Sequence, residues 1–301
     1  MQIWAASVVA DALSDLPGVE VFTYDGRGPW PGDPADVVVW VPPLQGVPDI
    51  PGLMSRMVKL RLVQTVTAGV EPYKPYVPDG ALLCNARGAH DAGTAEWAVG
   101  ALIAILRDFP DFGAAQARGE WTYHHTGALA DSTVLIVGYG SIGAAVERRL
   151  APFEVEIVRV ASTPRDGIHG PDDLPDLLPK ADAVILLVPA TSATAGLADA
   201  GFLARMKDGA VLVNAARGSV VDTDALVAEL ASGRLRAALD VTTPEPLPPD
   251  HPLWKVPGLL LTPHVAGSTP ASVRRQRNLV RSQIVRFLSG ERMRNVITGS
   301  Y

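Results

Sequence analysis

The sequence predicts an α/β protein with two doubly wound parallel-sheet domains. Three observations lead to this fold class. Short, continuously apolar runs, typical of strands covered on both faces, recur along the 301 residues. Helix-length segments alternate with these runs, and a glycine-rich turn stands between a strand and a helix. The length also agrees with two domains, since a domain averages about 150 residues.

The first 90 residues form the first predicted module. Strands are predicted over 2–6, 19–24, 36–41, 61–67 and 82–84, with a short helix over 54–60. A long apolar helix is predicted over 94–108, with Thr94 as its N-cap. Because it is apolar on nearly every side, this helix is expected in a deep core or at a subunit interface. Residues 109–131 are polar and irregular, and we interpret them as an arm or linker.

The second predicted module starts at Ser132 and alternates strictly between strands and helices. Its strands are predicted over 133–137, 155–160, 183–188, 210–214, 237–241 and 259–262, and its helices over 142–150, 174–178, 200–206 and 222–232. This alternation implies a parallel sheet with right-handed crossovers. A tail helix follows over 271–288, and we interpret its arginine run as a solvated face rather than a nucleic-acid patch.

Composition excludes several classes of protein. With 48% apolar and 19% charged residues, the chain is not of the disordered class, and its longest apolar run, Trp97–Leu106, is too short to cross a membrane. The net charge of −6 predicts no nucleic-acid or membrane partner. The single cysteine, Cys84, allows no internal disulfide, and no metal site is predicted. No Lys or Arg precedes Arg27, so we expect no signal peptide and a cytoplasmic location.

A G-x-G-x-x-G turn predicts a dinucleotide site between the strand at 133–137 and the following helix. It comprises Gly138, Tyr139, Gly140, Ser141, Ile142 and Gly143. Gly138 permits the tight turn, Gly140 lets the backbone approach a pyrophosphate, and Gly143 allows close packing of helix on strand. The amides at the helix N-terminus would then meet the phosphates.

The end of the next strand indicates which dinucleotide fits. An acidic residue there would bind the ribose 2′-hydroxyl of NAD and repel a 2′-phosphate. Instead, Ser162 and Thr163 are neutral donors, and Arg165 can pair with a phosphate. We therefore predict NADP(H) in preference to NAD(H).

From Gly138 onward the chain resembles the D-isomer-specific 2-hydroxyacid dehydrogenases. The resemblance is carried by Pro189–Thr194, Met206–Asp222, Leu239–Leu247, His251–Trp254 and Thr262–Ser268, in the order of that family. The N-terminal third matches more loosely, through Thr67–Val70, Asn85-Ala86 and Thr94–Glu96.

The resemblance implies a discontinuous domain layout. A flavodoxin-like substrate domain would comprise 1–92 plus 270–301, and a Rossmann dinucleotide domain, 93–269, would be inserted into it. The active site would lie in the cleft between them. The resemblance also implies a homodimer, as does the apolar helix at 94–108. Beyond the glycine turn, the cofactor contacts that it implies are Val188, Pro189, Thr194, Ala215, Asp240, His264 and Gly267.

Reduction of a 2-keto acid needs a proton donor, a partner that orients it and a cation that holds the carboxylate. His264 is predicted as the proton donor, since histidine titrates near neutrality. Glu245 is predicted to fix its tautomer and to stabilise the imidazolium. Arg217 is predicted to anchor the carboxylate and polarise the carbonyl. The resemblance adds the amides of Ala68 and Gly69 as further carboxylate donors.

The sequence therefore predicts NAD(P)H-dependent reduction of a small 2-keto acid, of the glyoxylate or hydroxypyruvate type, to a D-2-hydroxy acid. Two alternatives stay open. One is the same fold acting on formate or phosphite. The other is a dinucleotide-sensing regulator without turnover.

Overall fold

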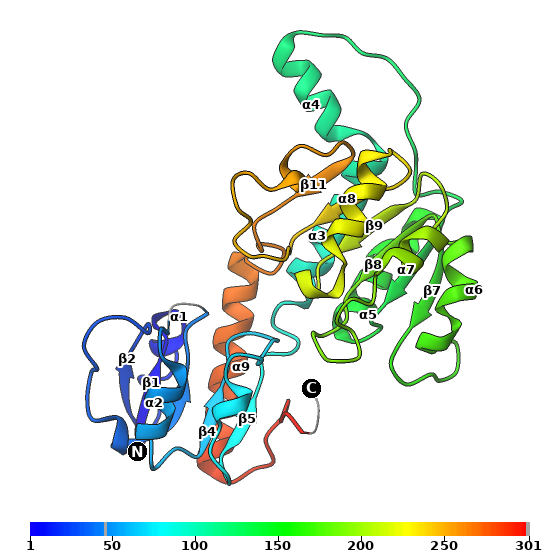
Figure 1. Cartoon of the computed structure of the whole chain (residues 1–301). Helices are drawn as coiled ribbons and strands as arrows, with labels where there is room; N and C mark the ends of the chain where they lie inside the picture. The colour runs from blue at the N-terminus through cyan, green and yellow to red at the C-terminus, as the bar shows by residue number, and fades with distance from the viewer. Residues whose placement is uncertain (45–46, 299–301) are drawn as a thin grey trace. The chain divides into compact units, whose positions relative to one another are not determined.

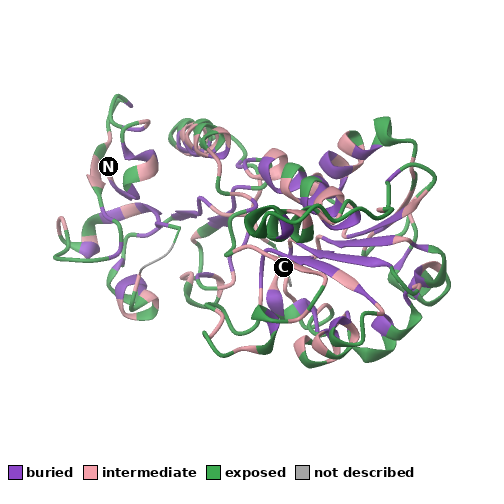
Figure 2. Cartoon of the chain, turned by 90° about the horizontal axis from the view of Figure 1, so that it is seen from above, coloured by how far each residue is buried: buried purple, intermediate pink, exposed green. Residues whose placement is uncertain are grey.

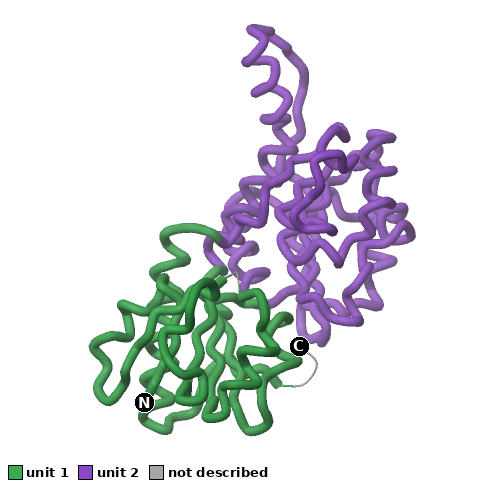
Figure 3. The backbone as a smooth tube through the Cα atoms, turned by 60° about the vertical axis from the view of Figure 1, so that its left-hand side comes forward, with its two compact units in different colours: residues 1–90, 268–301 green, residues 91–267 purple. Residues whose placement is uncertain are grey.

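The computed structural model of the chain describes residues 1–44 and 47–298, which form two compact units. Unit 1 comprises Met1–His90 with Ser268–Tyr301, and unit 2 comprises Asp91–Gly267 (Figure 3). The chain thus leaves unit 1 once, forms unit 2 and returns. Both crossing points lie two residues before the boundaries predicted from the sequence.

Unit 1 is built on a parallel sheet with the strand order β2-β1-β3-β4-β5. Its strands are β1 (Gln2–Ala5), β2 (Glu20–Thr23), β3 (Val37–Val41), β4 (Leu62–Gln64) and β5 (Leu82–Cys84). Its helices are α1 (Ser7–Ala10), α2 (Ile50–Arg56) and, from the end of the chain, α9 (Pro270–Ser289). This order is the flavodoxin-like one, and it confirms the predicted fold class for this unit.

Helix α9 completes the core of unit 1 (Figure 1). Val280 and Ile284 are fully buried in one cluster with Ile3 and Val39 of the sheet. The arginines of α9 correct the expectation of a merely solvated face. Arg277 Nε donates to the carbonyl of Val8, and Arg281 binds Asp15, so part of the run fixes α9 to the segment around α1.

Helix α2 starts and ends earlier than predicted. Asp49 accepts a hydrogen bond from the amide of Gly52 at 2.8 Å and caps the helix at Ile50, and Pro51 fits its first turn. The sequence pattern missed this start because the apolar run lies nearer the end of the helix. Cys84 is a core residue, as predicted, and its burial raises the pKa of the thiol to about 11.

Unit 2 is built on a second parallel sheet, with the strand order β11-β10-β9-β8-β6-β7. Its strands are β6 (Thr133–Val137), β7 (Glu156–Val160), β8 (Ala183–Leu186), β9 (Val211–Asn214), β10 (Arg236–Leu239) and β11 (Leu259–Leu261). Its helices are α3 (Asp91–Leu106), α4 (Phe109–Arg118), α5 (Ser141–Leu150), α6 (Leu174–Leu177), α7 (Ala200–Arg205) and α8 (Thr223–Ala231). The direction of the winding reverses between β6 and β8, which is where doubly wound sheets bind ligands.

Short 3₁₀ turns connect several of these elements. They span Pro34–Asp36, Lys74–Tyr76, Ala151–Phe153, Pro171–Asp173, Leu178–Lys180, Gly218–Val220 and Pro252–Trp254. Helix α4 corrects the expectation of an irregular segment after Asp108. Pro110 lies in its first turn, and Gly119 ends it with a left-handed φ of +71°. The helix and the extended chain after it project from unit 2 (Figure 1).

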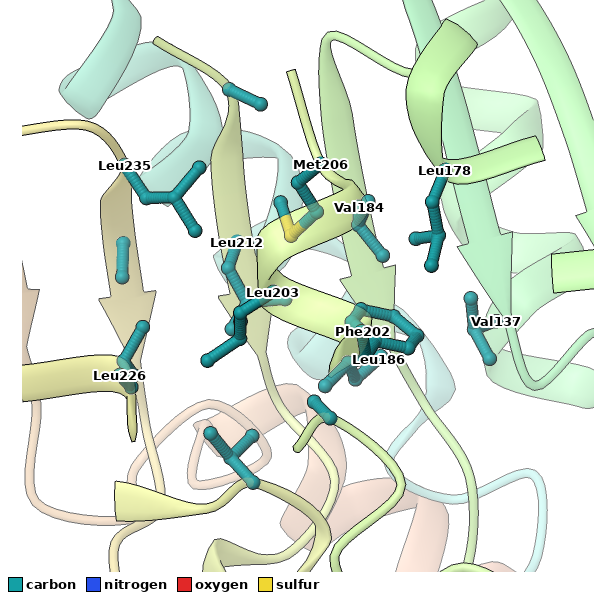
Figure 4. Packing of buried hydrophobic residues seen from close by; sticks show 14 of the residues in the cluster. Val137, Leu178, Val184, Leu186, Phe202, Leu203, Met206, Leu212, Leu226 and Leu235 are labelled. Carbon is teal, nitrogen blue, oxygen red and sulfur yellow. The ribbon is translucent and has the colours of Figure 1, made fainter. Parts of the chain in front are cut away.

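The unit 2 sheet is covered on both faces, which explains its continuously apolar strands. On one face, the sheet packs against α7 and α8 through residues such as Phe202, Leu203 and Leu226 (Figure 4). On the other, α3 and α5 pack against Val134 and Ile136, and Leu102 of α3 is fully buried. Figure 2 shows the buried strands in purple between these layers. The apolar surface of α3 is therefore used largely within its own unit.

The described residues, 1–44 and 47–298, include no helix that combines the length and apolarity needed to cross a membrane.

Candidate active site

The three predicted catalytic side chains follow three neighbouring strands of unit 2. Arg217 comes after β9, Glu245 after β10 and His264 after β11. The strands are parallel and in register, with Leu239 opposite both Asn214 and Leu261. Their carboxyl ends therefore lie at one edge of the sheet, and the three residues gather there.

His264 and Glu245 are in direct contact. His264 Nδ1 lies 2.5 Å from Glu245 Oε1, so the carboxylate accepts the Nδ1 proton and fixes the tautomer of the ring. Nε2 is then the nitrogen that can give or take a proton at a substrate. The two side chains are 45% and 39% exposed, which leaves the pair accessible to a small ligand.

A buried carboxylate, Asp240, shapes the backbone that carries His264. Its Oδ1 accepts from Thr262 Oγ1 and the amide of Val265, and its Oδ2 accepts from the amide of Ala266. The amide of His264 donates to the Asp240 carbonyl at 2.7 Å. His264 thereby takes a positive φ of +54°, which residues other than glycine seldom adopt. Asp240, which was predicted as a cofactor contact, thus holds the backbone of His264 in place.

Arg217 stands on a turn that the side chain of Asn214 holds. Asn214 is 1% exposed; it accepts from the amide of Ala216 and donates to the carbonyl of Arg217. The next residue, Gly218, packs directly on the β10 loop, since a Cβ there would lie 1.9 Å from the Thr242 carbonyl oxygen. The turn that carries Arg217 is therefore fixed against the chain that leads to Glu245.

The glycine turn has the features that a pyrophosphate requires. Gly138 has a φ of +105°, and a Cβ on it would lie 2.6 Å from the backbone of Leu187. A Cβ on Gly143 would lie 2.9 Å from the Gly138 oxygen, whereas one on Gly140 would point into open space. In the described part of the chain no side chain caps α5, so the amides of Ser141 and Ile142 are available to phosphate oxygens. These residues fit a bound dinucleotide.

The predicted ribose-side residues lie next to this turn. Arg165 folds back so that its Nη2 donates to the carbonyl of Tyr139 at 3.3 Å and its Nη1 to that of Thr163 at 3.2 Å. Ser162, Thr163 and Arg165 are exposed. Arg165 therefore stands at the rim of the glycine turn, with its guanidinium accessible to an anion.

The other predicted cofactor residues of unit 2 follow β8 and β9 or close the His264 turn. Thr194 Oγ1 donates to the carbonyl of Pro189 and accepts from the amide of Thr191, which closes the loop after Val188. The amide of Ala215 donates to the carbonyl of Leu186 across the sheet. Gly267 is the last residue of unit 2.

Ala68 and Gly69, predicted to bind the substrate carboxylate, lie in unit 1. They belong to the loop after β4, at the carboxyl edge of the unit 1 sheet.

Sequence reasoning missed a charged cluster beside the glycine turn. The Tyr139 hydroxyl donates to Glu147 of α5, and Arg159 of β7 binds the same carboxylate, with its Nε 2.9 Å from Oε2. The Arg159 hydrogen bonds hold the pKa of Glu147 below its ordinary value. The sequence shows charged residues on both α5 and β7, but their presence does not by itself specify a contact. Asn214 and Gly218 were likewise missed as supports of Arg217.

Among the described residues, no group of three or more His, Cys, Asp and Glu side chains is arranged to hold a metal ion.

A doubly wound domain with this glycine turn, and with an imidazole–carboxylate pair at the same sheet edge, defines a nicotinamide-dinucleotide-dependent oxidoreductase. The family described as "D-isomer specific 2-hydroxyacid dehydrogenase, NAD binding domain" matches residues 99–266, more than half of the chain. The chain belongs to this family, which confirms the predicted resemblance.

Known relatives include proteins of more than one substrate class. The chain is 34% identical over 256 residues to the glyoxylate reductase of Thermofilum pendens, covering 79% of this chain and 75% of that protein. The structure of an NADPH-dependent glyoxylate/hydroxypyruvate reductase from Sinorhizobium meliloti, with NADP and sulfate, matches with a TM-score of 0.84 at 28% identity, covering 98% and 97% of the two chains. The NAD-dependent formate dehydrogenase of Staphylococcus aureus, with NAD, matches over 100% of both chains with a TM-score of 0.81 at 27% identity.

Proposed function

We propose that this dehydrogenase reduces small 2-keto acids, of the glyoxylate or hydroxypyruvate type, to D-2-hydroxy acids. The observation that carries the proposal is the bond between His264 Nδ1 and Glu245. It directs Nε2 to the substrate as a proton donor, and a carbonyl oxygen needs that proton when its carbon is reduced. When bound, the nicotinamide cofactor supplies the hydride.

The other side chains of the site support the same reaction. Arg217 is a permanent cation that can hold the substrate carboxylate and the carbonyl oxygen together. Its positive charge stabilises the negative charge that develops on that oxygen. The amides of Ala68 and Gly69 would share the carboxylate.

A turnover assay with glyoxylate, hydroxypyruvate, pyruvate and larger keto acids tests this proposal. We expect oxidation of NADPH, with the highest kcat/KM for glyoxylate and hydroxypyruvate. Negligible turnover with every keto acid, together with tight dinucleotide binding, would instead support the sensing regulator.

Formate oxidation is the second candidate, because a formate dehydrogenase is among the structural relatives. Formate loses only a hydride when it becomes carbon dioxide, so no proton moves to or from a substrate oxygen. The His264–Glu245 pair therefore favours keto-acid reduction. Reduction of NAD or NADP by formate or phosphite, at a rate above that of any keto acid, would reverse this assignment.

We propose that NADP(H) is preferred to NAD(H). Ser162, Thr163 and Arg165 stand at the end of β7 without an acidic residue among them, and Arg165 lies against the glycine turn. A 2′-phosphate would gain a charge-assisted hydrogen bond from this guanidinium. Comparison of KM for NADPH and NADH, in the parent and in Arg165→Ala, tests this preference. A lower KM for NADH than for NADPH in the parent would contradict the preference for NADP(H).

We also propose that the protein is a homodimer. Helix α3 is largely buried in its own unit, so the support comes instead from the segment after it. Phe109, Trp121 and Tyr123 are 56%, 94% and 81% exposed on α4 and the extended chain that follows. Large exposed aromatic side chains are typical of subunit interfaces.

A further inference from the structure

The loop after β4 is held by hydrogen bonds to its backbone carbonyl groups. From Thr65 to Gly69, each carbonyl oxygen lies within hydrogen-bond distance of a donor in unit 1. The partners are Gln64 Nε2 for Thr65, His90 Nε2 for Val66, Thr65 Oγ1 and the amide of Ala86 for Thr67, Asn85 Nδ2 for Ala68, and Thr67 Oγ1 for Gly69. The loop has no regular secondary structure, so these bonds set its conformation.

These bonds also set the direction of the amides. In a trans peptide, the N–H of one residue points opposite to the carbonyl of the residue before it. Fixing the carbonyl of Thr67 therefore fixes the N–H of Ala68, and fixing the carbonyl of Ala68 fixes the N–H of Gly69. Thr65 Oγ1 binds the Thr67 carbonyl and Asn85 Nδ2 binds the Ala68 carbonyl, both at 2.8 Å, and the amide of Ala86 also binds the Thr67 carbonyl.

The two side chains are well placed to act as rigid supports. Thr65 and Asn85 are 1% and 3% exposed, so water does not compete for their hydrogen bonds. The remaining groups of Asn85 are also engaged. Its Oδ1 accepts from the amide of Arg87 at 3.1 Å, its own amide donates to the carbonyl of Asn295 at 3.1 Å, and its carbonyl accepts from Gln64 Nε2 at 3.2 Å.

The support continues into the C-terminal part of the chain. Gln283 of α9 donates to Gln64 Oε1 at 3.1 Å, and its own Oε1 accepts from the amide of Arg294. Asn295 Nδ2 donates to the carbonyl of Arg87 at 3.0 Å. The loop of unit 1 that is proposed to hold substrate thus depends on residues at the other end of the sequence.

We infer that Asn85 and Thr65 are positioning residues of the substrate site. They hold the carbonyls of Ala68 and Thr67, so that the amides of Gly69 and Ala68 keep the direction in which they bind the substrate carboxylate. The inference rests on the proposed function, because it takes this loop as the carboxylate-binding loop. It predicts a loss of substrate affinity without a loss of cofactor affinity.

The test uses Asn85→Ala and the matched pair Thr65→Val and Thr65→Ser in the full chain. Val removes the Thr65 hydroxyl at nearly constant volume, whereas Ser keeps it. We expect Asn85→Ala and Thr65→Val to raise KM for glyoxylate about tenfold, the loss of roughly one hydrogen bond to a charged group. KM for NADPH should not change, and Thr65→Ser should behave as the parent.

A second readout does not depend on turnover. Oxalate carries the carboxylate but no reducible carbonyl, so its inhibition constant should rise in parallel with KM in the same two variants. If Asn85→Ala fails to fold, the Thr65 pair alone decides. An unchanged KM in Thr65→Val, or an equal rise in KM for NADPH, would overturn the inference. Absence of keto-acid turnover in the parent would overturn the proposed function instead.

Discussion

At the scale of single residues, the backbone of His264 is as informative as its side chain. Its φ of +54° is imposed by Asp240, which binds the amides on the C-terminal side of the turn. Such a conformation is costly for most residues and persists where the surroundings determine it. Here it directs the imidazole towards Glu245.

The positive φ of His264 determines which substitution best tests its proposed role as proton donor. Asn adopts a positive φ more readily than most residues, so His264→Asn removes the imidazole with little effect on the turn. We expect keto-acid reduction to fall by about 10²–10⁴-fold, the usual contribution of general acid catalysis. The dissociation constant for NADPH, measured by fluorescence titration, should stay near that of the parent. Activity within tenfold of the parent would place the acid elsewhere.

Arg217 is tested through the split between KM and kcat. Arg217→Lys keeps a positive charge but loses the planar fork that holds two oxygens at once, and Arg217→Ala loses both. We expect KM for glyoxylate to rise in both variants, and more in Ala than in Lys, with KM for NADPH unchanged. Steady-state kinetics with each substrate varied in turn makes the measurement. Equal KM values for glyoxylate in the parent and in Arg217→Ala would contradict the anchor role.

The sequence allowed prediction of Arg217, Glu245 and His264, because each belongs to a motif that follows a strand. It did not allow prediction of the side chains that support Arg217 and the loop of Ala68 and Gly69. Asn214, Thr65 and Asn85 act through hydrogen bonds to backbone groups that are close in space and, for Asn85 and Ala68, 17 residues apart in the chain. The contact of Asn85 is not signalled before the strands are paired. Asn214 and Thr65 instead bind backbone groups only two or three residues away, in local turns that are common for Asn and Thr.

At the scale of elements, strands were predicted better than short helices. Strands buried on both faces are continuously apolar, and unit 2 alternates them with helices in a regular order. Helix α1 has only four residues, and α4 contains Pro110 and Gly113, which are poor helix formers, so neither was predicted. The start of α2 depends on the cap at Asp49 rather than on its apolar residues.

The contact between α5 and β7 predicts how the stability of the protein depends on pH. Hydrogen bonds from Arg159 lower the pKa of Glu147 in the folded protein, although partial burial opposes them. The stabilisation is therefore complete above the unfolded-state pKa and is lost as the pH falls through the folded pKa. At neutral pH, Glu147→Gln should lower the free energy of unfolding by about 1–2 kcal/mol. At acid pH, the variant and the parent should have the same free energy of unfolding.

Urea unfolding of the parent and Glu147→Gln at neutral and acid pH makes this measurement. Glu154→Gln is a suitable control, because among residues 1–44 and 47–298 the Glu154 carboxylate makes no hydrogen bond or ion pair, and the same charge is removed. A destabilisation that is equal at both pH values would show that the carboxylate charge is not responsible.

At the scale of the whole molecule, the discontinuous layout links the two ends of the chain. Helix α9 and residues 293–296 complete the core and one sheet edge of unit 1, where Val296 bridges Cys84 of β5. The first module therefore needs the last residues to finish its fold. The prediction that the C-terminal helix returns to the first module came from the family resemblance. An amphipathic helix does not specify by sequence alone the surface on which it packs.

Two highly exposed aromatic side chains of unit 2 give the last prediction. Trp121 and Tyr123 lie on the extended chain after α4, and Figure 1 shows this segment projecting from its unit. A projecting arm that carries aromatic side chains can pack on a second copy through a two-fold axis, which buries both arms at once. We therefore expect a dimer in sedimentation velocity, and we expect Trp121→Ser with Tyr123→Ser to give a folded monomer. Val58→Ser, at an apolar position of unit 1 that is 76% exposed, is the matched control and should remain dimeric. A monomeric parent, or a dimer that survives the double substitution, would contradict this interface.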